Sequence, residues 1–267
     1  MKFSEIFSSK GKRNKAANLI LRELDRINSL PADQGGVAQV FDKPFRFHHA
    51  SSFIHTHRRL FQDGMYMFSP QQNKGGVILD GGANMGLSVL YFSQHYPDHH
   101  IIAFEPEKSV FDILEENVRT FGLKNVELYQ KALWTEKKEL LFHSDGGMGG
   151  RVNNLYFNID RPIQKVEAVP LVDFLDSHVD FLKLDIEGAE EEVLMSCRGK
   201  LSQVRHLFFE YHNHLKKPQS LHRLLSLVEE EGFRYYIKES SFRSRPFLDE
   251  SLFCECFDMA ITVFCYK

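Results

Sequence analysis

The feature that most constrains the fold is an alternation of short apolar runs with amphipathic segments from residue 77 onward. The runs carry few charged residues, as strands buried on both faces of a sheet do. Such strands, when helices separate them, form a mostly parallel sheet with helices on both faces, which is an α/β fold. The strands are expected at 77–82, 100–106, 125–133, 180–185, 206–212, 234–238 and 259–267, and the main helices at 84–97, 109–122 and 219–233.

The two ends of the sequence complete this architecture. The order helix, strand, strand over 219–267 predicts a final strand inserted antiparallel into a seven-stranded sheet. Helical periodicity at 12–30, a strand within 41–49 and a helix at 51–68 predict an N-terminal α/β extension. We therefore expect an extension over residues 1–69, packed on a catalytic domain over residues 70–267.

Composition excludes several classes of protein. The net charge of −3 gives no electrostatic case for a nucleic-acid partner. The four cysteines form no CxxC pair, and nothing resembles a disulfide framework or a zinc site. The first residues lack the apolar core of a secretory signal, and no apolar run reaches the ~18 residues of a membrane span. A cytoplasmic enzyme is the expectation.

Polar groups follow four of the expected strands. They are Asp80, Glu105, the pair Asp185 and Glu187, and the pair Glu210 and His212. A single acid in such a place is explained by capping of the next helix. Polar groups at the ends of four strands in register favour a ligand site, because ligands of open parallel sheets bind outside the carboxyl ends of the strands.

The segment DGGANMG, residues 80–86, turns the chain from the first strand into a helix. Gly82 and Gly86 are interpreted as positions where backbone approaches a ligand, and the helix N-terminus offers free N–H groups. Glu105 lies 25 residues after Asp80, near the ~20-residue offset at which an acid meets ribose hydroxyls. A cofactor that contains a nucleoside is the prediction.

Two cofactors compete for this turn. A dinucleotide requires G-x-G-x-x-G, and Ala83 then stands where the second glycine belongs. S-adenosylmethionine favours Asp-x-Gly-x-Asn/Gly-x-Gly, which Asp80, Gly82, Asn84 and Gly86 match in register. The antiparallel last strand also suits a methyltransferase sheet. An NAD(P)-dependent oxidoreductase remains the alternative, and a binding protein without turnover is a third hypothesis.

The segments DGGANMG, FEP (104–106), EEN (115–117), KAL (131–133), KLDIEGAE (183–190) and FFEYH (208–212) together resemble the FkbM-type family of S-adenosylmethionine-dependent methyltransferases. The resemblance covers about residues 60–240. It implies a Rossmann-like class I methyltransferase fold and methylation of hydroxyl groups on sugars, glycolipids or polyketide-type metabolites. Gly81 departs from the family, which has an aliphatic residue there.

The resemblance also implies which residues hold the cofactor. The methionine side would be lined by Asp80, Gly82, Asn84 and Gly86. Glu105 would hold both ribose hydroxyls, and the end of the third strand at Ala132 would border the adenine. Asp185 would lie where the sulfonium methyl points.

Methyl transfer to a hydroxyl requires alignment and a proton acceptor. Asp185 and Glu187 would share one face of an extended chain and raise each other's pKa. His212, with an ordinary pKa near ~6.5, is a second candidate base. A metal at Asp185 with Glu210 or His212 lacks a strong ligand spacing, so none is predicted.

The acceptor is expected to be a small molecule or glycan. Tyr66, among the aromatic and histidine side chains of 55–68, is predicted to contact the cofactor and the acceptor. The glycine-rich segment DGGMGGR, residues 145–151, is expected to form either a mobile lid or a surface connection. The leading hypothesis is an S-adenosylmethionine-dependent O-methyltransferase.

Overall fold

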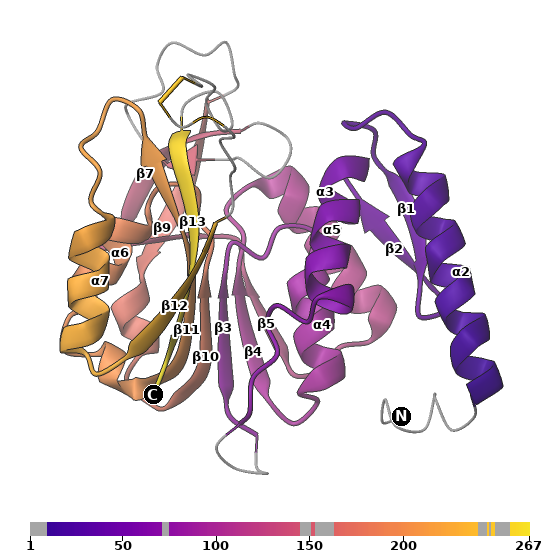
Figure 1. The fold of residues 1–267 in the computed structure, drawn as a ribbon, viewed down its shortest axis with the longest axis horizontal. Helices are drawn as coiled ribbons and strands as arrows, with labels where there is room; N and C mark the ends of the chain where they lie inside the picture. The colour runs from indigo at the N-terminus through magenta and orange to yellow at the C-terminus, as the bar shows by residue number, and fades with distance from the viewer. Residues whose placement is uncertain are drawn as a thin grey trace.

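The structure of the protein, a computed structural model, contains a central seven-stranded sheet flanked by helices (Figure 1). The structure describes residues 10–70, 75–144, 151–152, 163–239, 245, 247–248 and 257–267. The glycine-rich segment predicted as a lid lies, up to residue 150, outside the described residues.

The central sheet has the strand order β12-β13-β11-β10-β3-β4-β5. Its strands are β3 (Val77–Gly81), β4 (His100–Phe104), β5 (Val126–Tyr129), β10 (Val179–Leu184), β11 (Val204–His214), β12 (Arg234–Glu239) and β13 (Phe257–Tyr266). Only β13 runs antiparallel to its neighbours. The predicted class I methyltransferase architecture is confirmed. The strand order reverses between β3 and β10, which makes their carboxyl ends the switch point where ligands bind.

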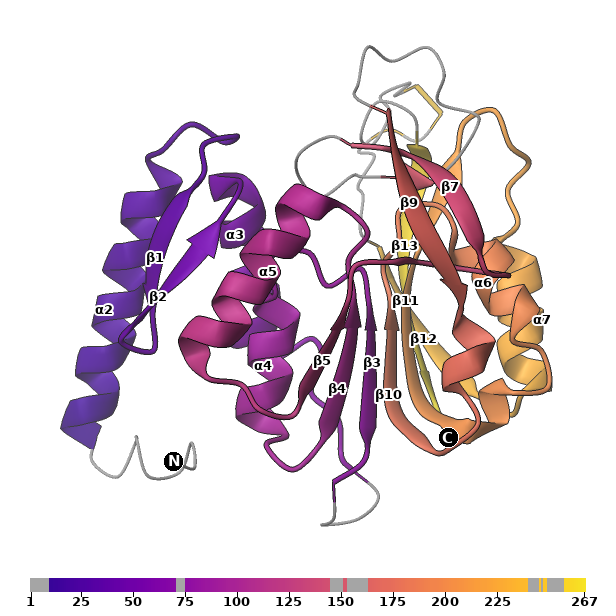
Figure 2. The same ribbon diagram turned by 180° about the vertical axis from the view of Figure 1, so that it is seen from behind.

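Helices cover both faces of this sheet, as predicted (Figures 1 and 2). One face carries α4 (Leu87–His95) and α5 (Lys108–Phe121), and the other carries α6 (Glu190–Ser196) and α7 (Leu221–Glu230). Short helical turns, η3 (Leu171–Phe174) and η4 (Leu201–Gln203), precede β10 and β11. Because both faces are covered, all six residues of β10 are buried, including two that are charged.

The N-terminal segment packs against α4 and α5 (Figure 2). It contains α2 (Lys10–Asn28), β1 (Gly36–Val40), β2 (Lys43–Phe47), α3 (Ala50–His57) and a π-helical turn, η1 (Arg58–Gln62). The sequence analysis missed β1, which pairs with β2 in a hairpin. Buried phenylalanines of β2 and α3 share one apolar core with α4.

A second sheet, of order β6-β9-β7-β8, corrects the predicted third strand. Its strands are β6 (Ala132–Trp134), β7 (Lys138–His143), β8 (Arg151–Val152) and β9 (Ile163–Pro170). The run 125–133, predicted as one strand, breaks at 130–131 into β5 of the central sheet and β6 of the second sheet. Apolar residues lie on both sides of the break without an intervening glycine or proline, so periodicity could not reveal it.

None of the helices in the described ranges has the length and apolar character that crossing a bilayer requires. The 19-residue helix α2 is long enough to span most of that distance, but charged residues recur along it. Its buried residues Leu24 and Ile27 face the N-terminal hairpin and α3 instead.

The ends of β3 and β10 approach each other closely at Gly82. A Cβ atom on this glycine would lie 1.9 Å from the backbone carbonyl oxygen of Asp185. Its φ of +79° is also in the left-handed region, which side chains other than glycine rarely adopt. Contact with protein backbone therefore requires glycine here, and a ligand contact at Gly82 stays a prediction.

We predict that Gly82→Ala destabilises the protein more than Gly122→Ala does. Gly122 ends α5 with a φ of +65°, and a Cβ added there would meet no atom within 4 Å. Gly122→Ala therefore measures only the cost of placing a side chain in a left-handed backbone conformation. That cost is about 1–2 kcal/mol, and the clash at Gly82 adds roughly 1–3 kcal/mol. Urea unfolding of both variants measures the difference, and equal losses would contradict the close approach.

Candidate functional site

The glycine turn and Glu105 lie side by side, as the strand-end argument predicted. The backbone N–H groups of Gly82 and Ala83 donate to the carbonyl oxygen of Phe104 at 3.1 and 2.9 Å. The next N–H, of Asn84, donates to Oε2 of Glu105 at 3.0 Å. The turn after β3 is thus attached to the end of β4, and the two polar elements of the predicted cofactor site form one surface.

Glu105 is suited to holding two hydroxyl groups. Its Oε1 accepts the backbone N–H of Glu107 at 2.9 Å, so each carboxylate oxygen accepts one protein donor. A carboxylate has about four acceptor positions, which leaves one free on each oxygen. Burial raises the pKa of Glu105 to about 7, although the two backbone N–H groups oppose the rise. Hydroxyl donors from a ribose would favour its ionised form.

A buried lysine, which the sequence analysis missed, supports the glycine turn through hydrogen bonds to its backbone. Lys183 of β10 donates from Nζ to the carbonyl oxygens of Gly81 and Gly82 at 2.9 and 2.8 Å. It also forms an ion pair with Oδ1 of Asp80 at 3.1 Å. Burial disfavours the charged lysine, but Asp80 and Asp185 raise its pKa overall. A lysine inside the apolar run FLKLD was the available signal.

Asp80 is fully enclosed beneath the turn. It has no exposed surface, and Oδ2 accepts the hydroxyl of Ser88 in α4 at 2.5 Å. Asp80 supports the turn through Lys183, and its contact with the methionine side of a cofactor stays a prediction. Gly86, with a φ of +91°, begins α4, and a Cβ there would lie 2.7 Å from Leu114.

The N-terminal segment also contacts the glycine turn. Nε2 of His48, which follows β2, lies 2.8 Å from Oδ1 of Asn84. The side chain of Asn117 in α5 donates to the carbonyl oxygens of Arg46 and Met85, both at 2.8 Å. Residues 36–48, in which the sequence showed no functional pattern, thus help to fix the conformation of Asn84, whose φ is +51°.

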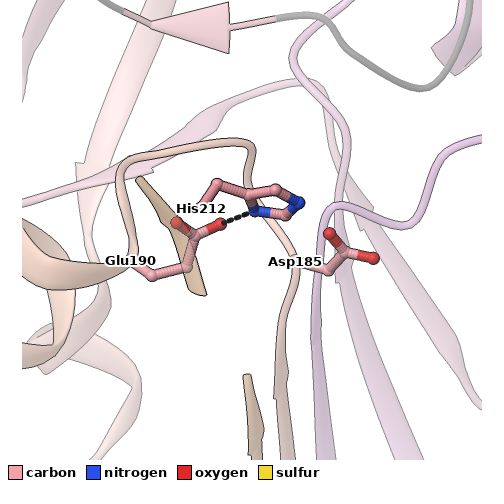
Figure 3. Close-up of side chains that lie close together, drawn as sticks. All are labelled: Asp185, Glu190 and His212. Carbon is pink, nitrogen blue, oxygen red and sulfur yellow. Dashed lines mark hydrogen bonds and ion pairs between the residues drawn. The ribbon is translucent and has the colours of Figure 1, made fainter. Parts of the chain in front are cut away.

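A cluster of ionisable side chains lies at the carboxyl ends of β10 and β11 (Figure 3). Asp185, Glu190 and His212 offer ligand atoms within 4.8 Å of one another. His212 lies between the two acids: Nδ1 is 3.2 Å from Oε1 of Glu190, and the other side of the ring faces Asp185. Glu187 adds a longer contact, 3.7 Å from Nε2 of His212. The sequence analysis did not select Glu190, which is almost fully buried.

The chain does not remain extended after Asp185, which corrects the predicted pairing with Glu187. Strand β10 ends at Leu184, and Glu187 has a φ of +56°, so the backbone turns there. Glu190 stabilises this turn by accepting the backbone N–H groups of Ile186 and Gly188, both at 3.0 Å. The acid that affects Asp185 most is Glu210 of β11. Burial and the charge of Glu210 together raise the pKa of Asp185 to about 6, against the opposing effect of nearby cations.

The electrostatics of His212 differ from the expected ones. Burial disfavours its charged form, but the carboxylates of Glu187 and Glu190 outweigh burial and raise its pKa well above 6.5. These carboxylates therefore favour the protonated imidazolium form of the ring. The pKa of His212 is therefore not the ordinary one, and its role as a proton acceptor stays a prediction.

The same three side chains have the right atoms to hold a divalent cation, but their contacts favour another use. Both oxygens of Glu190 already accept backbone N–H groups, and Nδ1 of His212 lies 3.2 Å from Oε1 of Glu190. A metal ion would have to displace the proton of His212 and compete with these donors. We interpret the cluster as a proton-handling site.

Two further candidates lie beside these groups. Tyr66 is buried among aromatic rings, with its centroid 4.8 Å from that of Phe208. Burial raises the pKa of its hydroxyl well above 10, and the charge of Asp185 adds to the rise. Tyr66 is a core residue whose hydroxyl lies near the site carboxylates. Ala132, at the start of β6, is buried in the apolar cluster of the second sheet.

Comparison with known proteins identifies the family. The sequence model described as the methyltransferase FkbM domain matches residues 80–235, more than half of the chain. The chain belongs to the FkbM methyltransferase family. The predicted family is confirmed, and the comparisons give the oxidoreductase alternative no support.

Curated relatives share about half of this chain. "Methyltransferase 1" of Beauveria bassiana is 30% identical over 161 residues, 52% of this chain and 64% of the relative. "2-O-methyltransferase NoeI" of Sinorhizobium fredii is 27% identical over 155 residues, 51% of this chain and 63% of the relative. The chain thus covers less than two thirds of the length of these relatives.

Solved structures with similar folds are more distant. The M. jannaschii TYW2 structure in complex with AdoMet has 11% identity and a TM-score of 0.47, covering 88% of this chain and 87% of that chain. A SAM-dependent methyltransferase from Aquifex aeolicus has 18% identity and a TM-score of 0.41, covering 78% and 92%. With scores this low, the fold assignment rests on the strand order of the central sheet.

We predict that Asp185 makes stability depend on pH. A carboxyl group whose pKa rises from 3.8 to about 6 on folding binds its proton more tightly in the folded state. Protonation of Asp185 therefore contributes fully to the free energy of unfolding below pH 3.8. This contribution is lost as the pH rises to about 6, and no further change from Asp185 is expected above that pH. Thermal unfolding should show the wild type losing stability relative to Asp185→Asn over this range. Asp63→Asn, at an exposed position, is the control and should follow the wild type.

Proposed function

We propose that the protein transfers a methyl group from S-adenosylmethionine to a hydroxyl group of a sugar, glycolipid or secondary metabolite. The observation that carries the proposal is the carboxylate of Asp185 at the switch point of the sheet, with a pKa raised to about 6. A group with this pKa is mostly ionised at neutral pH and is a stronger base than an ordinary aspartate. The relative named as a 2-O-methyltransferase supports a hydroxyl acceptor.

The residues that would hold the methyl donor follow from the surface built by the ends of β3 and β4. The turn 82–86, fixed by Lys183 and by Glu105, would receive the methionine end. Glu105 would accept both ribose hydroxyls in the positions left by its two backbone donors. Ala132 would border the adenine. When bound, S-adenosylmethionine supplies a methyl group activated by the positive charge of its sulfonium.

Asp185 would take the proton of the acceptor hydroxyl as the acceptor oxygen gains the methyl group. Its neighbours prepare it for this role: Glu210 raises its pKa, and Lys183, His212 and Arg59 keep the rise moderate. His212 would remain protonated and orient the carboxylate, because Glu187 and Glu190 retain its proton. Glu187 would hold His212 in place, a supporting role in place of the catalytic one first expected.

The charged side chains around Asp185 favour an uncharged acceptor. Four carboxylates, of Asp185, Glu187, Glu190 and Glu210, face the cations His212 and Arg59. Such a surface offers acceptors for hydroxyl hydrogens and repels phosphate groups near the reacting atom. A small polyol or the sugar portion of a glycan fits this chemistry, whereas nucleic acid does not.

The proposal predicts binding of S-adenosylhomocysteine and incorporation of labelled methyl groups. A ligand at ~100 times its Kd adds about 2.7 kcal/mol to stability, which shifts the unfolding midpoint by several degrees. NADH should give no shift. Screening nucleotide-sugars and glycolipids with methyl-labelled S-adenosylmethionine should identify the acceptor. A shift with NADH and none with S-adenosylhomocysteine would contradict the proposal.

Once an acceptor is known, Asp185→Asn should lower kcat by ~10²–10⁴-fold, because the proton acceptor is lost. The wild-type rate should rise with pH through about 6 and then level off, since Asp185 must be ionised. Asp63→Asn is the control and should retain the wild-type rate. Addition of EDTA should leave the rate unchanged. A metal requirement, or an Asp185→Asn variant with wild-type kcat, would refute the assignment.

A further inference from the structure

Arg59 reaches the carboxylate cluster from outside the segment that matches the family. It lies in η1, which continues α3 with π-helical hydrogen bonding over Arg58–Gln62. Single π-helical turns are rare and occur frequently at functional sites. The adjacent Arg58 is exposed, whereas the side chain of Arg59 keeps only 24% of its surface accessible. The sequence analysis assigned Arg59 no role.

The guanidinium of Arg59 is held by groups from three directions. Nη2 lies 3.6 Å from Oε1 of Glu210 and 3.4 Å from Oγ1 of Thr262 in β13. Nε lies 3.2 Å from Sδ of Met65, and Nη1 lies 3.3 Å from Nε2 of His55. Thr262 in turn donates its hydroxyl to Glu210 at 3.3 Å. Arg59, Thr262 and Glu210 therefore form a closed set of contacts.

We propose that Arg59 is a positioning residue for methyl transfer, which holds Glu210 as an anion so that Asp185 alone exchanges the proton. The inference rests on the proposed function. It assigns to the N-terminal segment a direct part in the chemistry of the site.

The distribution of charges supports this role. The charged groups that act on Asp185 are Lys183 of β10, Glu210 and His212 of β11, and Arg59 of η1, and Glu190 of α6 lies close to it. The charge of Asp185 acts on Tyr66, and His55 of α3 faces both Arg59 and Glu210. Lys183 contacts Asp80 and the glycine turn, and His212 contacts Glu190 and Glu187. Arg59 is the cation in ion-pair contact with Glu210.

Loss of Arg59 would change how the two acids titrate. Buried carboxylates that interact without a compensating cation share a proton, and the pKa of one rises strongly. The charge of Arg59 lowers the pKa of Asp185, while that of Glu210 raises it. Without Arg59, Asp185 would hold its proton to higher pH and would be a poorer acceptor at neutral pH.

The test compares the binding of S-adenosylmethionine and S-adenosylhomocysteine by calorimetry between pH 5 and 8.5. The two ligands differ by one methyl group and one positive charge, so their affinity ratio reports the charge of nearby carboxylates without need of an acceptor. In the wild type, the ratio should increasingly favour S-adenosylmethionine as pH rises through about 6. The midpoint of this change should move up by ~1 pH unit in Arg59→Met.

Matched variants separate the charge of Arg59 from its packing. Arg58→Met removes the neighbouring exposed arginine and should keep the wild-type midpoint. Arg59→Lys retains the charge and should move the midpoint back toward the wild type, which a purely structural role would not produce. Glu210→Gln should move it downward, and Arg59→Met should then cause a smaller upward shift than in the wild type, because only the direct effect of Arg59 on Asp185 remains.

Each outcome decides the inference. A wild type that binds neither ligand refutes the proposed function itself. If the wild type binds both ligands but its affinity ratio shows no midpoint between pH 5 and 8.5, the role of Arg59 is refuted and the proposed function is not. The same holds if the midpoint of Arg59→Met equals that of the wild type. Should Arg59→Met fail to fold, Glu210→Gln still decides, because an unchanged midpoint in that variant overturns the inference.

Discussion

The buried ion pair between Lys183 and Asp80 is the interaction on which the site depends. It lies between the two central strands of the sheet, where the strand order reverses, and Lys183 also binds two carbonyl oxygens of the glycine turn. An unpaired charge in this place would be costly, because burial removes the water that would otherwise solvate it. The pair thus ties the turn after β3 to β10, and so fixes the distance between the proposed donor surface and Asp185.

The site is a junction of segments that lie far apart in the sequence. The family match begins at residue 80, yet His48 contacts Asn84 and Arg59 contacts Glu210. Aromatic side chains of β2 and α3 join the apolar core of α4, so the N-terminal segment is held by packing as well as by polar contacts. In this architecture, segments outside the matched domain can determine the acceptor, while the matched domain contains the groups proposed to bind the donor.

The sequence predicted what local patterns encode. The parallel strands, the antiparallel β13 and the proximity of Asn84 to Glu105 follow from apolar runs and from the polar residues that end them. Glu190 was not predicted because the chain turns at Glu187, where a non-glycine residue adopts a left-handed conformation that no pattern announces. The high pKa of His212 and the contact of Arg59 depend on side chains from distant segments, and a single sequence carries no signal for such proximity. The sequence pattern also predicted β5 and β6 as one strand, because apolar residues occur in both.

The position of β13 has a consequence for how the chain reaches its native state. β13 pairs with β11 on one side and with β12 on the other, although both precede it in the sequence. Until β13 inserts, each of these strands presents an unpaired edge, which is a template for association with other chains. Closure of the sheet also requires pairing across long sequence separations, which slows folding. Assembly of the sheet is therefore expected to be late and vulnerable to aggregation, and a donor bound at the opposite half of the sheet would not protect these edges.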